Sequence, residues 1–319
     1  MVRSSDPVRL LDGGRYRRRR PILSGQFPAN RENNKECRRT RLEELHDIEA
    51  NRQLLFTVSR HARLQAGTVM STRKSLKTAG EALRQRLFGG DDGAPAVLRT
   101  LNTEASYGAI WSRPGLALDD RMVCALAALG AVQRLPKLRR HVGAALDLGL
   151  SARSIVEILI QIGIYAGFAA SEEAVEAAGA VFANRGLAMP EETSREDSLE
   201  VLTARGRQLM QQLHGDRAMQ GYATPGNSVT GALYPLAVQY GYGEIWFRPG
   251  LDLRRRALVA VAAFTALKLD SQVTKFGQSA LNMGLSRVEV IEAVIQTAPI
   301  SGFAPALNAL GGLSEVLGG

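Results

Sequence analysis

Residues 107–116 read YGAIWSRPGL, and residues 242–251 read YGEIWFRPGL, 135 positions further along the chain. When this offset is kept, residues 107–170 and 242–305 share 25 identical residues in 64 positions without a gap. A period this long indicates a duplicated domain, because the units of solenoid proteins are much shorter. We therefore expect two copies of one fold in tandem.

The duplication continues upstream with a different spacing. Residues 80–91, GEALRQRLFGGD, resemble residues 206–216, GRQLMQQLHGD, at an offset of 126. The second copy therefore carries 135 − 126 = 9 extra residues, which we expect within 217–233. From these matches we expect an N-terminal arm at 1–70, a first repeat at 71–192 and a second repeat at 193–319.

The composition is that of a soluble globular protein, with 45% hydrophobic and 22% charged residues in a chain of 319. No stretch approaches the ~18–20 uncharged apolar residues of a membrane span, and no apolar segment near the N-terminus indicates a secretory signal. Cys37 and Cys124 are the only cysteines. This disfavours a disulfide framework or a thiolate metal site and favours the reducing cytoplasm.

The net charge of +9 belongs mainly to the arm. Residues 1–69 hold 15 Lys/Arg against 8 Asp/Glu, a net of +7, whereas residues 70–319 hold 25 against 23, a net of +2. We expect the arm to be largely disordered or loosely helical. Its RYRRRRP run at 15–21 favours a solvated tail, with a tether to nucleic acid or an anionic surface as the alternative. The body has no basic stripe, so nucleic acid is not expected as its partner.

The pattern of the body is helical. Met122, Leu126 and Leu129 recur at helical spacing behind two acidic residues. In the second copy, Ser286 and Glu289 form an S-x-x-E capping box at the start of another helix. Alternating β-branched runs, which would indicate strands, are missing from the sequence. We expect two all-α bundles related by a pseudo-twofold repeat.

The repeated ten-residue phrase reads as a break between helices. Arg-Pro-Gly cannot continue a helix, because proline disfavours helical geometry at the residue before it. Trp111 or Trp246 would anchor this turn by burying a large area. Arg113 and Arg248 then lie on a rigid turn, where a guanidinium can fork onto a carboxylate. The alternative is that each arginine bonds to carbonyl groups of the loop.

The order of these elements is similar to a known family. W-S-R-P-G-L, a helix of small residues, a helix bearing His141, a Gly-Leu-Ser turn and EILIQIGIYAGFAA resemble the carboxymuconolactone decarboxylase family, which is related to the AhpD-like alkylhydroperoxidases. The resemblance covers about 75–185 and again about 200–317. It implies an all-α chain of two tandem AhpD-like bundles, assembled as a homo-oligomer, either a trimer of tandem chains or a dimer.

The resemblance also implies a chemistry. The family removes carbon dioxide from a carboxylated lactone in aromatic catabolism, with no metal and no organic cofactor. The lactone itself accepts the developing charge, so the protein supplies a carboxylate clamp, a proton donor and a desolvated pocket. We expect a lyase of this type, acting on a carboxylated lactone or on a related cyclic small molecule such as a secondary metabolite. The alternative is a binding or scaffold member of the family without catalysis.

The family's decarboxylases carry Glu-Leu-x-x-His on the second helix of the motif. The first copy keeps His141 but has Lys137 at the glutamate position, and the second copy has Gln272 and Phe276. We expect the positive charge of Lys137 to lower the pKa of His141 and favour a neutral base. The second copy has no titratable group at these positions, which predicts a scaffold or a pocket wall.

The resemblance implies His141 and Tyr165 as catalytic residues of one site in the first repeat; Ile300 replaces Tyr165 in the second. The side chains expected to bind the carboxylated substrate are Trp111, Arg113, Arg121, Lys137, Trp246 and Arg248. The structural alternative for His141 is a hydrogen-bonded helix residue.

Thiol peroxidase chemistry is disfavoured. The peroxidase branch needs Cys-x-x-Cys just before the histidine, and Arg134 and Lys137 stand at those places. Cys124 falls in an apolar helix and is expected to pack in the core.

Overall fold

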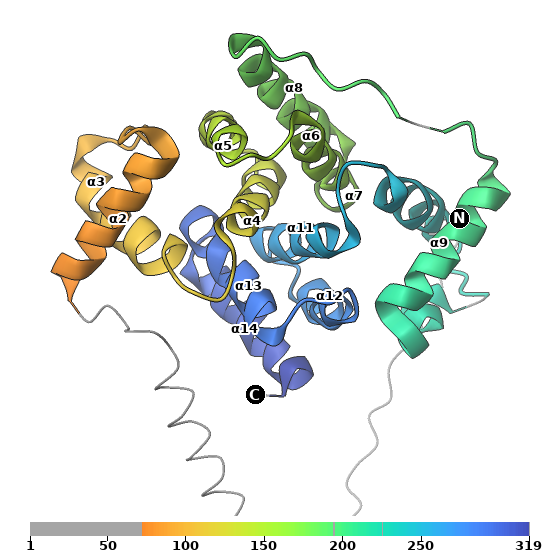
Figure 1. The fold of residues 1–319 in the computed structure, drawn as a ribbon. Helices are drawn as coiled ribbons and strands as arrows, with labels where there is room; N and C mark the ends of the chain where they lie inside the picture. Colours follow the sequence, from red (N-terminus) through yellow and green to blue (C-terminus); the bar gives the residue numbers. More distant parts are fainter. Residues whose placement is uncertain (1–71, 194, 225, 319) are drawn as a thin grey trace, which may run out of the picture. The chain divides into compact units, whose positions relative to one another are not determined.

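The computed structural model describes residues 72–193, 195–224 and 226–318 (Figure 1). The expectations for the arm at 1–70 therefore lie outside the described residues. Within these ranges the chain is helical and contains no strand, which confirms the all-α prediction. None of the described helices combines the length and the apolar character that a membrane crossing requires.

The first repeat starts with a long helix and a π-helix, followed by a bundle. Its elements are α2 (Arg73–Phe88), α3 (Ala96–Asn102), the π-helix η1 (Thr103–Trp111), α4 (Leu118–Ala131), α5 (Leu135–Asp147), α6 (Ala152–Gln161), α7 (Gly163–Ala166) and α8 (Phe168–Asn184).

The second repeat follows the same order. Its elements are α9 (Leu199–His214), the 3-10 helices η2 (Gly215–Met219) and η3 (Gly221–Ala223), α10 (Tyr234–Leu236), the π-helix η4 (Ala237–Glu244), the 3-10 helix η5 (Ile245–Phe247), α11 (Leu253–Ala266), α12 (Asp270–Asn282), α13 (Arg287–Ser301) and α14 (Phe303–Leu317). Helices α4, α5, α6 and α8 each begin 135 residues before α11, α12, α13 and α14. This match confirms the tandem duplication.

The helix ends follow the local sequence signals. At the start of α13, the Glu289 amide donates to Ser286 Oγ over 3.3 Å, and the Ser286 amide donates to Glu289 Oε2 over 2.7 Å. This is the predicted capping box. The break at Arg-Pro-Gly is also confirmed, since η1 ends at Trp111 and α4 begins at Leu118.

The glycines of the two breaks lie close to the opposite repeat. Gly115 and Gly250 have φ angles of 96° and 100°, a left-handed region that favours glycine. A Cβ on Gly115 would lie 2.6 Å from Val288, and one on Gly250 would lie 2.3 Å from Arg153. Each turn is therefore pressed against a helix of the other repeat.

The two repeats share one core. Helix α4 packs against α11, and α13 packs against α4 (Figure 1). The side chains of Met122, Leu126 and Leu258 are fully buried in this core. Cys124 is fully buried there as well, as predicted.

A carboxylate of the second repeat holds two arginines of the first. Glu292 on α13 accepts hydrogen bonds from Arg113 Nε and Nη2, at 2.9 and 2.7 Å to Oε1, and from Arg121 Nη2, at 2.8 Å to Oε2. The same Arg121 nitrogen donates to the carbonyl of Arg113 over 2.8 Å. The Arg-Pro-Gly turn is thereby tied both to its own α4 and to α13 of the other repeat.

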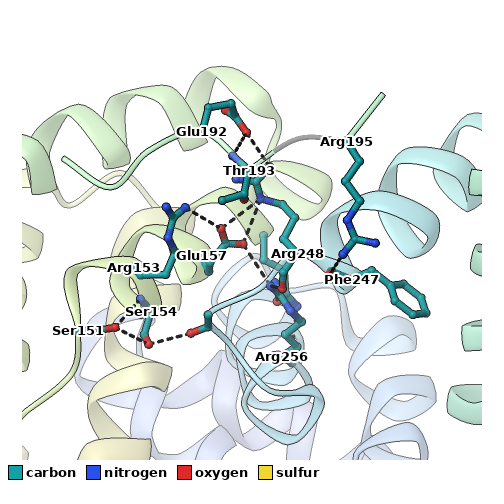
Figure 2. A network of polar contacts seen from close by, with 12 residues as sticks. Ser151, Arg153, Ser154, Glu157, Glu192, Thr193, Arg195, Phe247, Arg248 and Arg256 are labelled. Carbon is teal, nitrogen blue, oxygen red and sulfur yellow. Dashed lines mark hydrogen bonds and ion pairs between the residues drawn. The ribbon is translucent and has the colours of Figure 1, made fainter. Parts of the chain in front are cut away.

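The reverse contact joins the equivalent residues of the other repeat (Figure 2). Glu157 on α6 accepts from Arg248 Nε, at 3.1 Å to Oε2, and from Arg256 Nη2 at 3.1 Å. Arg256 Nη2 also donates to the carbonyl of Arg248 over 2.7 Å. We call the two networks together the reciprocal clamp, defined by Glu157 with Arg248 and Arg256, and Glu292 with Arg113 and Arg121.

Removing one charge of the reciprocal clamp should destabilise the whole chain. Glu292→Gln leaves Arg121, whose side chain is 1% exposed, without its counter-charge. Breaking a buried ion pair from one side costs about 3–5 kcal/mol, and we expect a loss of this order in the free energy of unfolding, measured by urea denaturation.

A matched control is Glu81→Gln, which removes an exposed carboxylate that lies 3.9 Å from Lys77. Such a pair contributes at most about 0.5 kcal/mol. Equal stability of the two variants would show that the clamp does not hold the repeats together.

Candidate functional site

Two cavities lie between the repeats, at equivalent places. Cavity A has a volume of about 760 Å³ and is lined by Gly163, Ile164, Tyr165 and Phe168 of the first repeat and by Leu233, Tyr234, Leu236, Ala237, Tyr240, Gly241, Tyr242, Trp246, Phe264, Leu269, Gln272 and Phe276 of the second. Cavity B has a volume of about 600 Å³ and includes Lys137 of the first repeat and residues 298–303 of the second in its lining. Residues 298–303 correspond to 163–168, so each repeat contributes this segment, I-Y-A-G at 164–167 and P-I-S-G at 299–302, to the cavity of the other.

Tyr165 is the main polar group that the first repeat places in cavity A. Its hydroxyl accepts a hydrogen bond from Gln161 Nε2 over 3.0 Å and interacts with the Trp246 indole, which can only donate. Burial raises the pKa of Tyr165, so the hydroxyl keeps its proton at neutral pH. Because both neighbours are donors, that proton is available to an acceptor in the cavity.

Cavity B lacks this group. Ile300 stands at the position of Tyr165, and the matching amide of Gln296 has a buried Nε2 with no hydrogen-bond partner among the described residues. Gln161 Nε2, by contrast, bonds to Tyr165 and to the Arg256 carbonyl. The two cavities therefore differ in chemistry although they share a backbone.

An aromatic cluster repeats in the two halves with one exchange. In the first repeat, the ring centroid of Phe88 lies 5.8 Å from Tyr107 and 5.1 Å from His141. In the second repeat, His214 takes the place of Phe88 and lies 5.7 Å from Tyr242 and 5.2 Å from Phe276. Histidine and phenylalanine have thus exchanged places within one arrangement of rings.

His141 is a buried neutral imidazole. Its Nδ1 lies 2.8 Å from the carbonyl of Lys137, so Nδ1 must be the protonated nitrogen. Burial is the main cause that lowers the pKa of His141 to about 4, and the charge of Lys137 contributes in the expected direction. Its ring also packs 5.9 Å from that of Trp111.

His214 is held by hydrogen bonds at both nitrogens. Ser279 Oγ donates to the Lys275 carbonyl over 3.1 Å, so it accepts from His214 Nδ1, which lies 2.9 Å away. His214 Nε2 then accepts from the Tyr242 hydroxyl over 3.0 Å. Burial and the positive charges of Arg217 and Lys275 lower the pKa of His214 to about 4. The second repeat therefore has a titratable side chain, at a position other than those of Gln272 and Phe276.

His214 opens onto a smaller cavity, which we call the His214 pocket. It has a volume of about 250 Å³ and is lined by His214, Arg217, Ala218, Gln220, Gly221, Ala223, Tyr234, Tyr242, Lys275 and Phe276. Tyr234, Tyr242 and Phe276 also line cavity A, so the two spaces share a wall. Half of the lining falls in 217–233, the stretch where the sequence predicted the nine extra residues.

Lys137 does not face an open anion site. Its Nζ donates to the Asp92 carbonyl over 2.7 Å and lies 3.7 Å from Asp92 Oδ2. Asp92 is 3% exposed and also accepts from the Tyr107 hydroxyl over 2.9 Å. Lys137 lines cavity B while its charge is matched by a carboxylate of the protein.

The structure separates residues that the resemblance had joined in one site. Tyr165 lines cavity A with residues of the second repeat, whereas His141 packs beside Phe88 and Trp111 of the first. The expected single site with both groups in the first repeat is therefore not what the structure shows. The reason is that the I-Y-A-G segment crosses to the opposite repeat.

The expected arginines hold a carboxylate, but it is a carboxylate of the protein. Arg113 and Arg121 bind Glu292, and Arg248 binds Glu157. Arg121 and Arg248 are buried, whereas the Arg113 side chain is 43% exposed, and none of these arginines lines cavity A or cavity B. Trp246 lines cavity A.

The sequence analysis missed four side chains of the His214 pocket: His214, Arg217, Tyr242 and Lys275. One signal was available, because the upstream match at offset 126 aligns Phe88 with His214. Among the apolar positions of that match, the change from phenylalanine to histidine is the one that adds a titratable group.

The described residues bring together no group of three or more His, Cys, Asp or Glu that could hold a metal ion. The polar groups that face the cavities are hydroxyl, amide, imidazole, guanidinium and ammonium groups. These groups suit an organic anion as ligand.

Comparison with known proteins agrees with the duplicated fold. The model of the carboxymuconolactone decarboxylase family matches twice, at residues 95–180 and 232–315. The chain belongs to this family. Each match contains one Arg-Pro-Gly turn and one glutamate of the reciprocal clamp, so the two matches correspond to the two repeats that the clamp joins.

Two curated relatives of the family are decarboxylases by name. A 4-carboxymuconolactone decarboxylase of Acinetobacter baylyi is 34% identical over 91 residues, which are 28% of this chain and 67% of that protein. The nitrosuccinic acid decarboxylase npaB of Metarhizium robertsii is 28% identical over 75 residues, 24% of this chain. The match spans 52%, about half, of the length of the second relative.

The buried imidazole of His141 predicts an acid-dependent loss of stability. A histidine whose pKa falls from 6.5 to about 4 on folding binds fewer protons in the native state, so its contribution is complete above pH 6.5 and is lost as the pH falls toward 4. The integrated effect is on the order of 3 kcal/mol.

His141→Phe copies the residue that the second repeat has at this place and should remain folded. Its free energy of unfolding, measured by urea denaturation at several pH values, should fall less steeply between pH 6.5 and 4 than that of the wild type. The carboxylates contribute equally to the pH dependence of both proteins, so their effect cancels when the two curves are subtracted. Parallel curves would mean that His141 is not held neutral in the native state.

Proposed function

We propose that the protein is a cofactor-independent lyase that removes carbon dioxide from a carboxylated lactone or related cyclic molecule bound in cavity A. The observation that carries the proposal is the Tyr165 hydroxyl, held by two donors with its proton available in a cavity of about 760 Å³. The family membership and the names of the two relatives support the reaction type.

The chemistry needs a place for the electron pair that carbon dioxide leaves behind. In a lactone, the ring carbonyl oxygen accepts this charge, and the Tyr165 hydroxyl can donate a hydrogen bond to it. A donor prepositioned for charge that develops in the transition state is worth about 10²–10³ in rate. The walls formed by Trp246, Phe264 and Phe276 exclude water, which destabilises the departing carboxylate relative to neutral carbon dioxide.

A proton must then replace the carboxylate on carbon. Tyr242 lines both cavity A and the His214 pocket, and its hydroxyl hydrogen-bonds to His214 Nε2. The Tyr242 proton is directed to His214, so we assign the Tyr165 hydroxyl, whose proton is available in cavity A, as the proton donor to the carbanionic carbon, with the phenol regaining a proton from water. Neutral His214 holds the Tyr242 hydroxyl in the wall that the two spaces share.

A second candidate site is cavity B, with His141 as its acid–base group. Lys137 lines this cavity, and the Lys137 carbonyl accepts from the His141 ring one turn further along α5. Neither cavity is filled by side chains, which favours a ligand-binding role over the alternative of a packed scaffold.

The proposal includes an assembly and a location. We propose a homo-oligomer, a trimer of tandem chains or a dimer, in the cytoplasm, with repeats at 71–192 and 193–319. Val97 and Leu101 on α3 are 90% and 60% exposed, and Phe303 and Leu307 on α14 are 61% and 65% exposed. Apolar side chains of this size at the surface are suited to contacts between chains.

Tyr165→Phe tests the assignment of cavity A. Removing the hydroxyl should lower the rate of carbon dioxide release by about 10²–10³ while the aromatic packing is kept. The substrates to assay are 4-carboxymuconolactone and nitrosuccinic acid, which the names of the relatives suggest.

The matched control is Ile300→Val, a change at the same position of cavity B. It should leave the rate within about twofold, because it removes no polar group. A rate that falls with His141→Ala and not with Tyr165→Phe would move the site to cavity B. Normal turnover in both variants would reject both assignments.

A further inference from the structure

The His214 pocket corresponds to a place that repeat 1 fills with its own carboxylate. Asp92 Oδ2 accepts from the Tyr107 hydroxyl over 2.9 Å and from Asn102 Nδ2 over 2.7 Å, and it lies 3.7 Å from Lys137 Nζ. A buried carboxylate with a tyrosine, an amide and an ammonium group around it is well satisfied. The first repeat therefore needs no ligand there.

The second repeat lacks this carboxylate. Ala218 follows His214 by four residues, as Asp92 follows Phe88, and it packs in a small apolar cluster with Tyr242, the counterpart of Tyr107. Ala218 lines the His214 pocket of about 250 Å³. Where the first repeat has an internal anion, the second has an open space.

The charges around this space are positive. Arg217 and Lys275 line the pocket, and none of the described residues that line it is acidic. Both charges act on the His214 ring, since they contribute to lowering its pKa. Arg217 Nη2 donates to the Lys275 carbonyl over 3.4 Å, which keeps the guanidinium beside α12.

We propose that the His214 pocket binds the carboxylate group of a small organic ligand, at the place that the Asp92 side chain has in repeat 1. Arg217 and Lys275 provide the charge, the tyrosine and glutamine side chains of the lining provide further polar contacts, and Phe276 provides a face for an apolar ring. A carboxylate is the ligand chemistry because the matching place in the same fold holds one.

The proposal deepens the proposed function, and it rests on that function for the identity of this ligand as the substrate. Two cations stabilise a carboxylate more than the neutral carbon dioxide that it would become, so they would slow the loss of a carboxylate bound to them. The carboxylate in the His214 pocket is therefore an anchor that the reaction retains. The departing group lies on the side of Tyr242 and Phe276, the side chains that border both this pocket and cavity A.

Histidine NMR measures this binding without any turnover. The full chain has four histidines, and ¹³C labelling of histidine gives one ring signal for each, with His141→Gln and His214→Gln to assign two of them. Benzoate at millimolar concentration should shift the His214 signal and leave the His141 signal in place. Benzamide, which has the same shape without the charge, should shift neither.

Three variants test the chemistry of the pocket. Arg217→Gln and Lys275→Gln should each weaken benzoate binding about tenfold, the effect of one charge-assisted contact. Ala218→Asp should abolish it, because the chain then supplies the carboxylate as repeat 1 does. Arg140→Gln is the matched control, since Arg140 stands 135 positions before Lys275 and should not affect binding. Circular dichroism checks that each variant is folded.

The outcomes separate this inference from the proposed function. No shift of the His214 signal at tens of millimolar benzoate, or equal binding by wild type, Arg217→Gln and Lys275→Gln, would overturn the carboxylate site. If Tyr165→Phe still abolishes carbon dioxide release in that case, the proposed function stands alone. Benzoate binding in a protein that releases no carbon dioxide from either substrate would support the site and reject the function.

Discussion

The two glutamates of the reciprocal clamp fix α6 and α13 against the arginines of the opposite repeat. Glu157 is on α6, directly before the segment that carries Tyr165, and its partners Arg248 and Arg256 are in the opposite repeat. The same ion pairs that join the repeats therefore deliver Tyr165 into cavity A. Burial of these charges is costly unless they are paired, so the hydrogen bonds from Arg248 and Arg256 to Glu157 hold α6 in place.

The exchange of histidine and phenylalanine shows that one arrangement of aromatic rings can carry the imidazole at either of two positions. Ring distances in the two halves agree closely, 5.8 against 5.7 Å and 5.1 against 5.2 Å. In the first half the imidazole bonds to its own helix, and in the second it bonds to a serine and a tyrosine beside an open pocket. Either ring fills the space, so the packing allows phenylalanine or histidine at both places. The position of the histidine decides where a proton can be bound.

Sequence reasoning reached the fold because its signals are local or periodic. The offset of 135, the capping box at Ser286 and the turn at Arg-Pro-Gly all reappear in the helix boundaries. The site was harder, since the partners of Arg113 and Arg121 lie more than 170 positions away in the chain. Only a three-dimensional arrangement reveals that their carboxylate is Glu292, and that five residues within 217–223 line a pocket beside His214.

The crossing of the repeats also changes how their pairing depends on concentration. Two separate polypeptides that complete each other's cavities would part on dilution, because their association is bimolecular. Here residues 185–198 connect α8 to α9, so each half meets the other at an effective concentration set by this short tether. The cavities therefore persist at any expression level, and one of them is free to change without an identical change in the other.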